Sequence, residues 1–116
     1  MKKIETIIRK SKFNDVKEAL HNVDVNFFTY WDVTGLGNEK SAHVYRGISY
    51  STSDIKRRYL SIVVNDDFEK ITINAILNSA RTGDVGDGKI FVSDITEAYR
   101  IRTGKKGGET LKKVSK

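Results

Sequence analysis

The stretch RTGDVGDGKIFV, residues 81–92, decides between two fold classes. Gly83, Gly88 and Lys89 match the G-x-x-x-x-G-K spacing of a nucleotide-binding P-loop, which would open a helix and continue with Ser or Thr. The next residue here is Ile90, and the run IFVSDI is apolar, β-branched and aromatic, a composition typical of a strand. The sequence therefore predicts a tight glycine turn that leads into a strand, and it argues against a P-loop NTPase.

Hydrophobic patterning, followed outward from this turn, predicts the other elements. They are a strand at 2–9, a helix carrying Phe13, Val16, Leu20 and Val23, strands at 25–33 and 59–64, and a helix carrying Ile73, Ile76, Leu77 and Ala80. Ser11 or Asn14 is the expected cap of the first helix, and Asp66 or Asp67 that of the second. Alternation at 99–102 adds a short last strand. The βαββαβ order predicts an α+β, ferredoxin-like, split βαβ sandwich with helices on one face of an antiparallel sheet.

The strand at 25–33 bears large side chains on both faces, with Phe27 and Trp31 on one and Phe28 and Tyr30 on the other. Because the helices cover only one face of such a sheet, the second face also needs a cover. In so short a chain, self-association is the expected route.

Length and composition predict a single domain, since 116 residues with 38% hydrophobic content can build one core. No apolar run of membrane length, no signal-like N-terminus and no cysteine occur, so we expect a cytoplasmic protein. The net charge of +6 is concentrated after residue 102, where five lysines and one glutamate contribute +4. We therefore expect a domain at 1–104, a basic flexible tail at 105–116, and no nucleic-acid partner.

About twenty residues between the two middle strands, roughly 35–56, show neither a helical nor a strand period. Structureless loops of this length are uncommon in compact domains and are usually functional. This polar segment contains Tyr45 and Tyr50. We expect a long loop that offers a surface to partner proteins.

The glycine turn has the composition of an anion site. Gly86 and Gly88 can adopt positive φ and expose backbone N–H groups, and Lys89 adds a positive charge. On a strand at 99–102, Arg100 and Arg102 would project from one face as a pair. These groups would form a triphosphate cradle, but a plain turn and a solvated strand edge fit the same spacing.

Groups suited to catalysis are few, which predicts a binding protein and not an enzyme. His21 and His43 lie far apart, and no serine has an evident base nearby. Two other functions stay open. An RRM-type RNA-binding module shares the βαββαβ order, although only Tyr59 offers an aromatic platform on the central strands. A weak ATPase would use the glycine turn without a base to position water.

Several motifs together resemble the PII family of nitrogen-regulatory signal proteins. The opening MKKIETIIRKSKFNDVKEAL (1–20), the loop start VTGLGNEK (33–40) and the motif YRGISY (45–50) each resemble a part of that family. RTGDVGDGKIFV followed by YRIRTG (99–104) resembles its second signature and its end. The resemblance spans residues 1 to about 104.

This resemblance implies a homotrimer of ferredoxin-like subunits that binds ATP or ADP in the clefts between neighbours. The matching positions are Gly86, Asp87, Gly88 and Lys89 for phosphate and ribose, Arg100 and Arg102 from the neighbouring subunit, Thr29 for adenine, and Ile7, Gly35, Gly37, Asn38 and Val63 lining the cleft.

The resemblance also implies control through the long loop, which nucleotide and 2-oxoglutarate would reset. The loop would dock on a target such as an ammonium transporter, the only implied membrane contact, or a nitrogen-metabolism enzyme. Glu39, Lys40 and Arg57 match the effector positions, with Glu39 as a magnesium ligand, and Tyr50 matches a modifiable tyrosine. Glu39 replaces the usual glutamine and would repel 2-oxoglutarate by about a kcal/mol. Sensing of ATP alone is therefore an open alternative.

Overall fold

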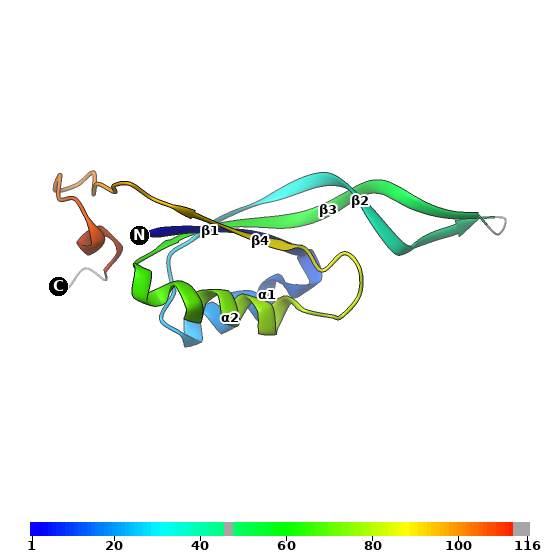
Figure 1. The fold of residues 1–116 in the computed structure, drawn as a ribbon, viewed down its shortest axis with the longest axis horizontal. Helices are drawn as coiled ribbons and strands as arrows, with labels where there is room; N and C mark the ends of the chain where they lie inside the picture. The colour runs from blue at the N-terminus through cyan, green and yellow to red at the C-terminus, as the bar shows by residue number, and fades with distance from the viewer. Residues whose placement is uncertain (46–47, 113–116) are drawn as a thin grey trace.

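The computed structural model describes residues 1–45 and 48–112, with the side chains of residues 1–36 and 55–112. Four strands form an antiparallel sheet in the order β2-β3-β1-β4, and both α-helices lie on one face of it (Figure 1). The strands are β1 (Lys2–Arg9), β2 (Thr29–Tyr45), β3 (Ile48–Val64) and β4 (Lys89–Asp94), and the helices are α1 (Phe13–Asn22) and α2 (Glu69–Ala80). The ferredoxin-like fold predicted from the sequence is confirmed.

The core lies between this sheet and the two helices. Alternation along β1 turns Ile4 and Ile8 toward the helices, and Ile4 is paired with Ile62 on β3. These residues are buried against side chains at helical spacing, among them Val16 and Leu20 of α1. Burial of each large aliphatic side chain contributes about 1.5–3 kcal/mol, so this layer supplies most of the stability.

Thr72 of α2 is the basis of a stability prediction. Its side chain is 0% exposed, and its hydroxyl has no hydrogen-bond partner among the described residues. Thr72→Val replaces this hydroxyl by a methyl group of the same shape, so it should raise the free energy of unfolding by about 1 kcal/mol. The buried hydroxyl of Thr6 instead donates to the Lys89 carbonyl at 3.0 Å. Urea unfolding should therefore show the opposite sign for Thr6→Val, and equal effects of the two substitutions would contradict this account.

The predicted helix caps are wrong. Short 3₁₀ turns, Lys10–Lys12 and Asp66–Phe68, precede α1 and α2, and neither helix has a side-chain cap hydrogen bond. Asp66 instead accepts a hydrogen bond from the N-terminal amine at 2.9 Å. This ion pair attaches the chain start to the junction of β3 and α2, a long-range contact that local sequence does not reveal.

The segment expected to be a structureless loop is largely a hairpin. The strand predicted at 25–33 starts at Thr29 and, like its partner, extends far beyond the core. Figure 1 shows β2 and β3 extending together past the other two strands. Gly35 is paired with Ile55 and His43 with Tyr50, with a register shift between residues 38 and 43. Main-chain hydrogen bonds between two strands need no apolar pattern where no core lies behind them, which explains the missing strand period.

The strand predicted at 99–102 is also wrong, because these residues form a tight turn. The Arg100 N–H donates to the Lys105 carbonyl at 2.8 Å, and the Gly104 N–H donates to the Arg100 carbonyl at 2.7 Å. The Ile95 N–H donates to the carbonyl of Met1, the residue just before β1. The residues after Ile95 therefore extend past the end of the strand beside them. Without a neighbouring strand, the segment pairs with itself, through a bridge between Tyr99 and Lys106.

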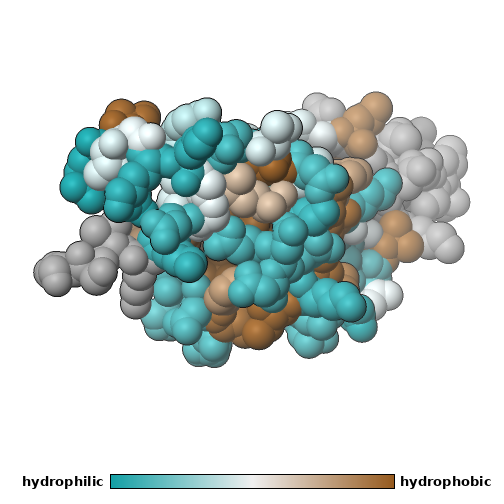
Figure 2. All heavy atoms as spheres, turned by 60° about the vertical axis from the view of Figure 1, so that its left-hand side comes forward, coloured by the Kyte–Doolittle hydropathy of each residue, from teal (hydrophilic) through white to brown (hydrophobic). Residues whose placement is uncertain are grey.

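The tail, expected to be flexible, folds back onto the domain as far as the structure describes it. A 3₁₀ turn at Gly108–Leu111 lies beside the end of β3, where Asn65 Nδ2 donates to the Gly108 carbonyl at 3.1 Å. Ile101, by contrast, is 99% exposed. Figure 2, which brings this end of the molecule forward, shows hydrophobic residues (brown) among hydrophilic ones (teal).

No described segment of the chain covers the sheet face away from the helices. Trp31 and Tyr59 stack on it with ring centroids 4.6 Å apart, and Trp31 remains 44% exposed. Phe91 on β4 is 52% exposed. No described helix is long and apolar enough to cross a membrane.

Candidate functional site

An open groove of about 600 Å³ lies where the glycine turn meets the three neighbouring strands. It is lined by Ile7 of β1, Gly35 and Leu36 of β2, Ile55 and Arg57 of β3, and residues 84–89. Small-molecule sites commonly have this size. The structure thus brings together six of the residues predicted to bind nucleotide, Ile7, Gly35, Gly86, Asp87, Gly88 and Lys89. Arg57, predicted as an effector residue, lines the same groove.

The turn depends on glycine at three positions. Gly83, Gly86 and Gly88 have φ values of 94°, 105° and 105°, a region that side-chain-bearing residues avoid. Gly88 is also packed against β1, since a Cβ atom there would lie 1.7 Å from the Ile7 carbonyl oxygen. The match to a P-loop spacing therefore has a different cause, a left-handed turn pressed onto a strand.

Asp87 organises this turn from within. Its carboxylate accepts hydrogen bonds from the backbone N–H groups of Thr82 at 2.8 Å and Gly83 at 2.9 Å, from the Thr82 hydroxyl, and from Arg9 Nε at 3.1 Å. These bonds, led by that from the Thr82 hydroxyl, hold the pKa of the Asp87 carboxyl well below its ordinary value. A carboxylate has about four lone-pair sites. The four hydrogen bonds match these sites and hold the side chain within the turn, and the role of Asp87 in the predicted phosphate and ribose loop stays a prediction.

Sequence reasoning missed Arg9, Thr82 and Gly83 as parts of the site. Thr82 and Gly83 precede Asp87 by five and four residues, and the glycine and aspartate residues of this segment are a local signal for a turn. Arg9 is 78 residues away in sequence and gives no comparable signal.

Lys89 places an exposed positive charge beside the groove. The Thr6 hydroxyl donates a hydrogen bond to the Lys89 carbonyl. Lys89 is also the first residue of β4, directly after the turn. Across the described side chains, its ammonium has no carboxylate within ion-pair distance. An anion in the groove would therefore not have to displace an internal partner of this lysine.

Four further predicted residues, Val63, Thr29, Arg100 and Arg102, lie away from the groove, toward the other end of the sheet or beyond it. Val63 is six positions beyond Arg57 on β3, which is about 20 Å at 3.3 Å per residue. Thr29 is paired with Ser61 near the same end, and Arg100 and Arg102 follow the end of β4. The Arg100 guanidinium donates to the Glu109 carbonyl at 3.1 Å. One chain therefore does not bring the two arginines to the glycine turn.

For other predicted residues, the structure describes the backbone but not the side chains. Gly37, Asn38, Glu39 and Lys40 belong to β2 and Tyr50 to β3, and only their backbone is described. Within the part of the chain that the structure describes, no three His, Cys, Asp or Glu residues gather as metal ligands. The magnesium role predicted for Glu39 stays a prediction.

Comparison with known proteins gives consistent matches. Residues 1–105 match the family described as nitrogen regulatory protein P-II. The chain is 46% identical to the nitrogen regulatory protein P-II of Bradyrhizobium diazoefficiens and 42% identical to that of Azospirillum brasilense, each over 96% of this chain and 100% of the relative. It is 43% identical to the nitrogen regulatory protein P-II 1 of Methanothermobacter thermautotrophicus, over 96% of this chain and 97% of the relative. Each relative is named as a regulatory protein.

Proposed function

The chain belongs to the P-II nitrogen regulatory protein family, and from this premise we propose that it is a trimeric signal protein that binds ATP or ADP between its subunits. Family membership supports a role in nitrogen-regulation signalling and not in catalysis. It also argues against the RNA-binding and ATPase alternatives. The observation that carries the nucleotide proposal is that the predicted binding groups form two sets at opposite ends of one sheet. The glycine turn with Lys89 lies at one end, and Val63 and the two arginines lie toward the other.

Such an arrangement fits a head-to-tail assembly. In a heterologous contact, the groove end of one subunit meets the arginine end of the next, and repetition around a closed ring completes every site. Three subunits would form such a ring, with the uncovered sheet face around Trp31 and Tyr59 buried between them. Each nucleotide would then be held by residues of two neighbouring subunits.

The chemistry of the two ends suits an adenine nucleotide. Backbone N–H groups of the glycine turn and the ammonium of Lys89 are donors for phosphate oxygens. Arg100 and Arg102 from the neighbour would add charge-assisted hydrogen bonds, for which Arg100 must leave the Glu109 carbonyl. Ile7 and Val63 would provide apolar contacts, and Thr29, Gly35, Gly37 and Asn38 would complete the cleft. ADP would bind with fewer phosphate contacts.

The long hairpin of β2 and β3 is the proposed regulatory segment. Its base contributes Gly35, Ile55 and Arg57 to the groove, so occupation of the groove can alter the hairpin. A target protein, such as an ammonium transporter or a nitrogen-metabolism enzyme, would dock on it. Tyr50 on this hairpin would be a contact or a modification site.

Titration calorimetry with Mg-ATP tests the nucleotide proposal. The native protein should bind, and Lys89→Ala should weaken binding by at least about tenfold because a charge-assisted phosphate contact is lost. Lys70→Ala is the matched control, since Lys70 is an exposed lysine of α2 away from the groove. Equal affinities of native protein and Lys89→Ala would remove the phosphate role of the turn.

A second titration tests the effector. Glu39 would repel the carboxylates of 2-oxoglutarate by about a kcal/mol at partly shielded distances. With Mg-ATP present, 2-oxoglutarate should therefore bind Glu39→Gln several-fold more tightly than the native protein. If the native protein binds it as tightly, Glu39 does not set effector choice, and Lys40 and Arg57 would be the residues to examine next.

A further inference from the structure

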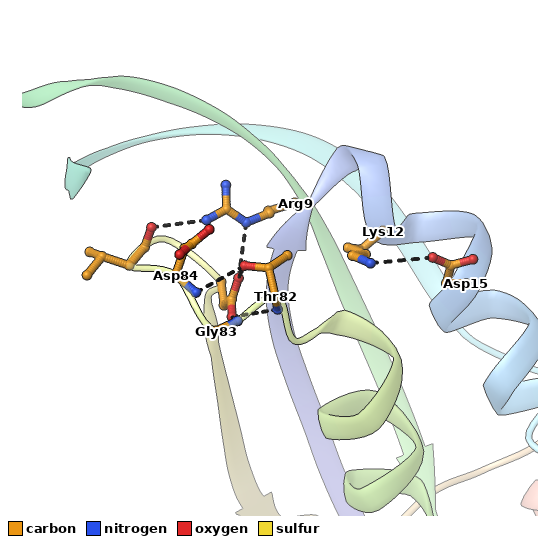
Figure 3. Close-up of polar contacts among 8 residues, drawn as sticks. Arg9, Lys12, Asp15, Thr82, Gly83 and Asp84 are labelled. Atoms are coloured by element: carbon orange, nitrogen blue, oxygen red, sulfur yellow. Dashed lines mark hydrogen bonds and ion pairs between the residues drawn. The ribbon is translucent and has the colours of Figure 1, made fainter. Parts of the chain in front are cut away.

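We propose that Arg9 is a positioning residue for nucleotide binding, which fixes the glycine turn through Asp87 and Val85 and does not itself contact the ligand. This inference rests on the proposed nucleotide function. Arg9 is the last residue of β1 and is distant in sequence from the turn that it holds. Figure 3 shows its guanidinium directed at the loop that follows α2.

The guanidinium binds the turn on both sides of Gly86. Arg9 Nε donates to Asp87 Oδ1 at 3.1 Å, and Arg9 Nη2 donates to the Val85 carbonyl at 3.0 Å. Gly86 lies between these two acceptors with a φ of 105°. The fork of N–H donors therefore fixes the two residues that flank one of the three positive-φ glycines of the turn.

Asp87 passes this restraint to the start of the turn. The same carboxylate that accepts from Arg9 also accepts from the backbone N–H groups of Thr82 and Gly83. The Thr82 hydroxyl in turn accepts from the Asp84 N–H at 3.2 Å. One side chain from β1 thus restrains the turn from its first residues to its last.

The backbone of β1 holds the other side of the turn. Gly88 lies against the Ile7 carbonyl so closely that no side chain fits there. Ile7 is also the register partner of Lys89. The turn is therefore set by β1 at two points, by the main chain at Ile7 and by a side chain at Arg9, and both determine where Lys89 and the turn N–H groups are presented.

Lysine cannot replace arginine in this role. An ammonium is a point charge on a flexible stem, whereas the guanidinium is a planar fork that reaches a carboxylate and a carbonyl together. Arg9→Lys should therefore preserve the attraction to Asp87 but lose the restraint at Val85. We expect a partial loss of nucleotide affinity in this variant and a larger loss in Arg9→Gln.

Two measurements on the 116-residue chain test the proposal. In calorimetry, Arg9→Gln should weaken Mg-ATP binding about tenfold, and Arg9→Lys by an intermediate factor. In the nucleotide-free protein, amide hydrogen exchange of residues 82–87 should accelerate in Arg9→Gln. A residue that only contacts the ligand would leave that exchange unchanged, so this readout separates positioning from direct contact.

A double-mutant cycle gives the decisive comparison. If Arg9 acts in part through Asp87, the variant with both Arg9→Gln and Asp87→Asn should lose less Mg-ATP affinity than the sum of the two single losses, and the remaining effect of Arg9→Gln reflects its contact with the Val85 carbonyl. Lys12→Gln is the matched control, because Lys12 is a nearby surface lysine paired with Asp15 at 3.8 Å (Figure 3). It should change neither affinity nor exchange.

Each outcome supports or overturns the proposal. Weaker binding with unchanged exchange would make Arg9 a direct ligand, and fully additive losses in the cycle would overturn the route through Asp87. Unchanged binding and exchange would leave it without a role. If the native protein does not bind Mg-ATP, the proposed function fails, while faster exchange in Arg9→Gln would still establish the restraint on the turn.

Discussion

Substitution of Gly88 by alanine should destabilise the protein by about 2–5 kcal/mol and remove nucleotide binding. Two costs add at this position. The φ of 105° places an alanine in the left-handed region, which costs about 1–2 kcal/mol. The new Cβ would also lie 1.7 Å from the Ile7 carbonyl oxygen, and the forced backbone shift costs about 1–3 kcal/mol more.

Gly83→Ala separates these two costs. Gly83 has a similar φ of 94°, but nothing lies within 4 Å of a Cβ atom built there. Urea unfolding should show a loss of about 1–2 kcal/mol for this variant, the conformational cost alone. Equal losses of stability at positions 83 and 88 would mean that the turn is not pressed onto β1. Retained Mg-ATP binding in Gly88→Ala would show that binding in the groove does not need the close contact between Gly88 and Ile7.

The parts of the fold that were predictable from the sequence are those with a local hydrophobic period. Residues such as Ile4, Val16 and Ile76 recur at strand or helical spacing because one face of each element is buried, and this pattern fixed the order of strands and helices. The outer hairpin has no such period, because its pairing comes from main-chain hydrogen bonds without a core behind it. The backbone pairing of residues 35–45 with 48–55 was therefore not predictable.

For the site, the residue types could be predicted but their grouping could not. Glycines beside Lys89 indicated a turn able to bind an anion. The restraint by Arg9 depends on tertiary contact between the end of β1 and a loop after α2. The expected pairing of Arg100 and Arg102 on a strand failed because the chain leaves the sheet before them. Local periodicity contains no information on where the sheet ends.

The second large effect concerns complementation between subunits. Lys89→Ala removes a charge from the groove end, and the pair Arg100→Ala and Arg102→Ala removes charges from the other end of the sheet. Each protein alone should bind Mg-ATP weakly. If sites form between neighbours, refolding the two proteins together should restore binding, because a groove with Lys89 then meets a neighbour with both arginines in about one cleft in four.

Calorimetric stoichiometry of the refolded mixture measures this recovery. The matched control is a mixture of the two single variants Arg100→Ala and Arg102→Ala, whose lesions lie in the same half-site, so that every cleft still lacks one arginine and mixing restores nothing. Recovery of Mg-ATP binding in the first mixture alone would require that the two ends of one subunit's sheet contribute to two different binding sites. Absence of recovery in both, with native affinity intact, would place all three residues in one subunit's site. The chain would then have to bring Lys89, at the start of β4, together with arginines that follow the end of the same strand.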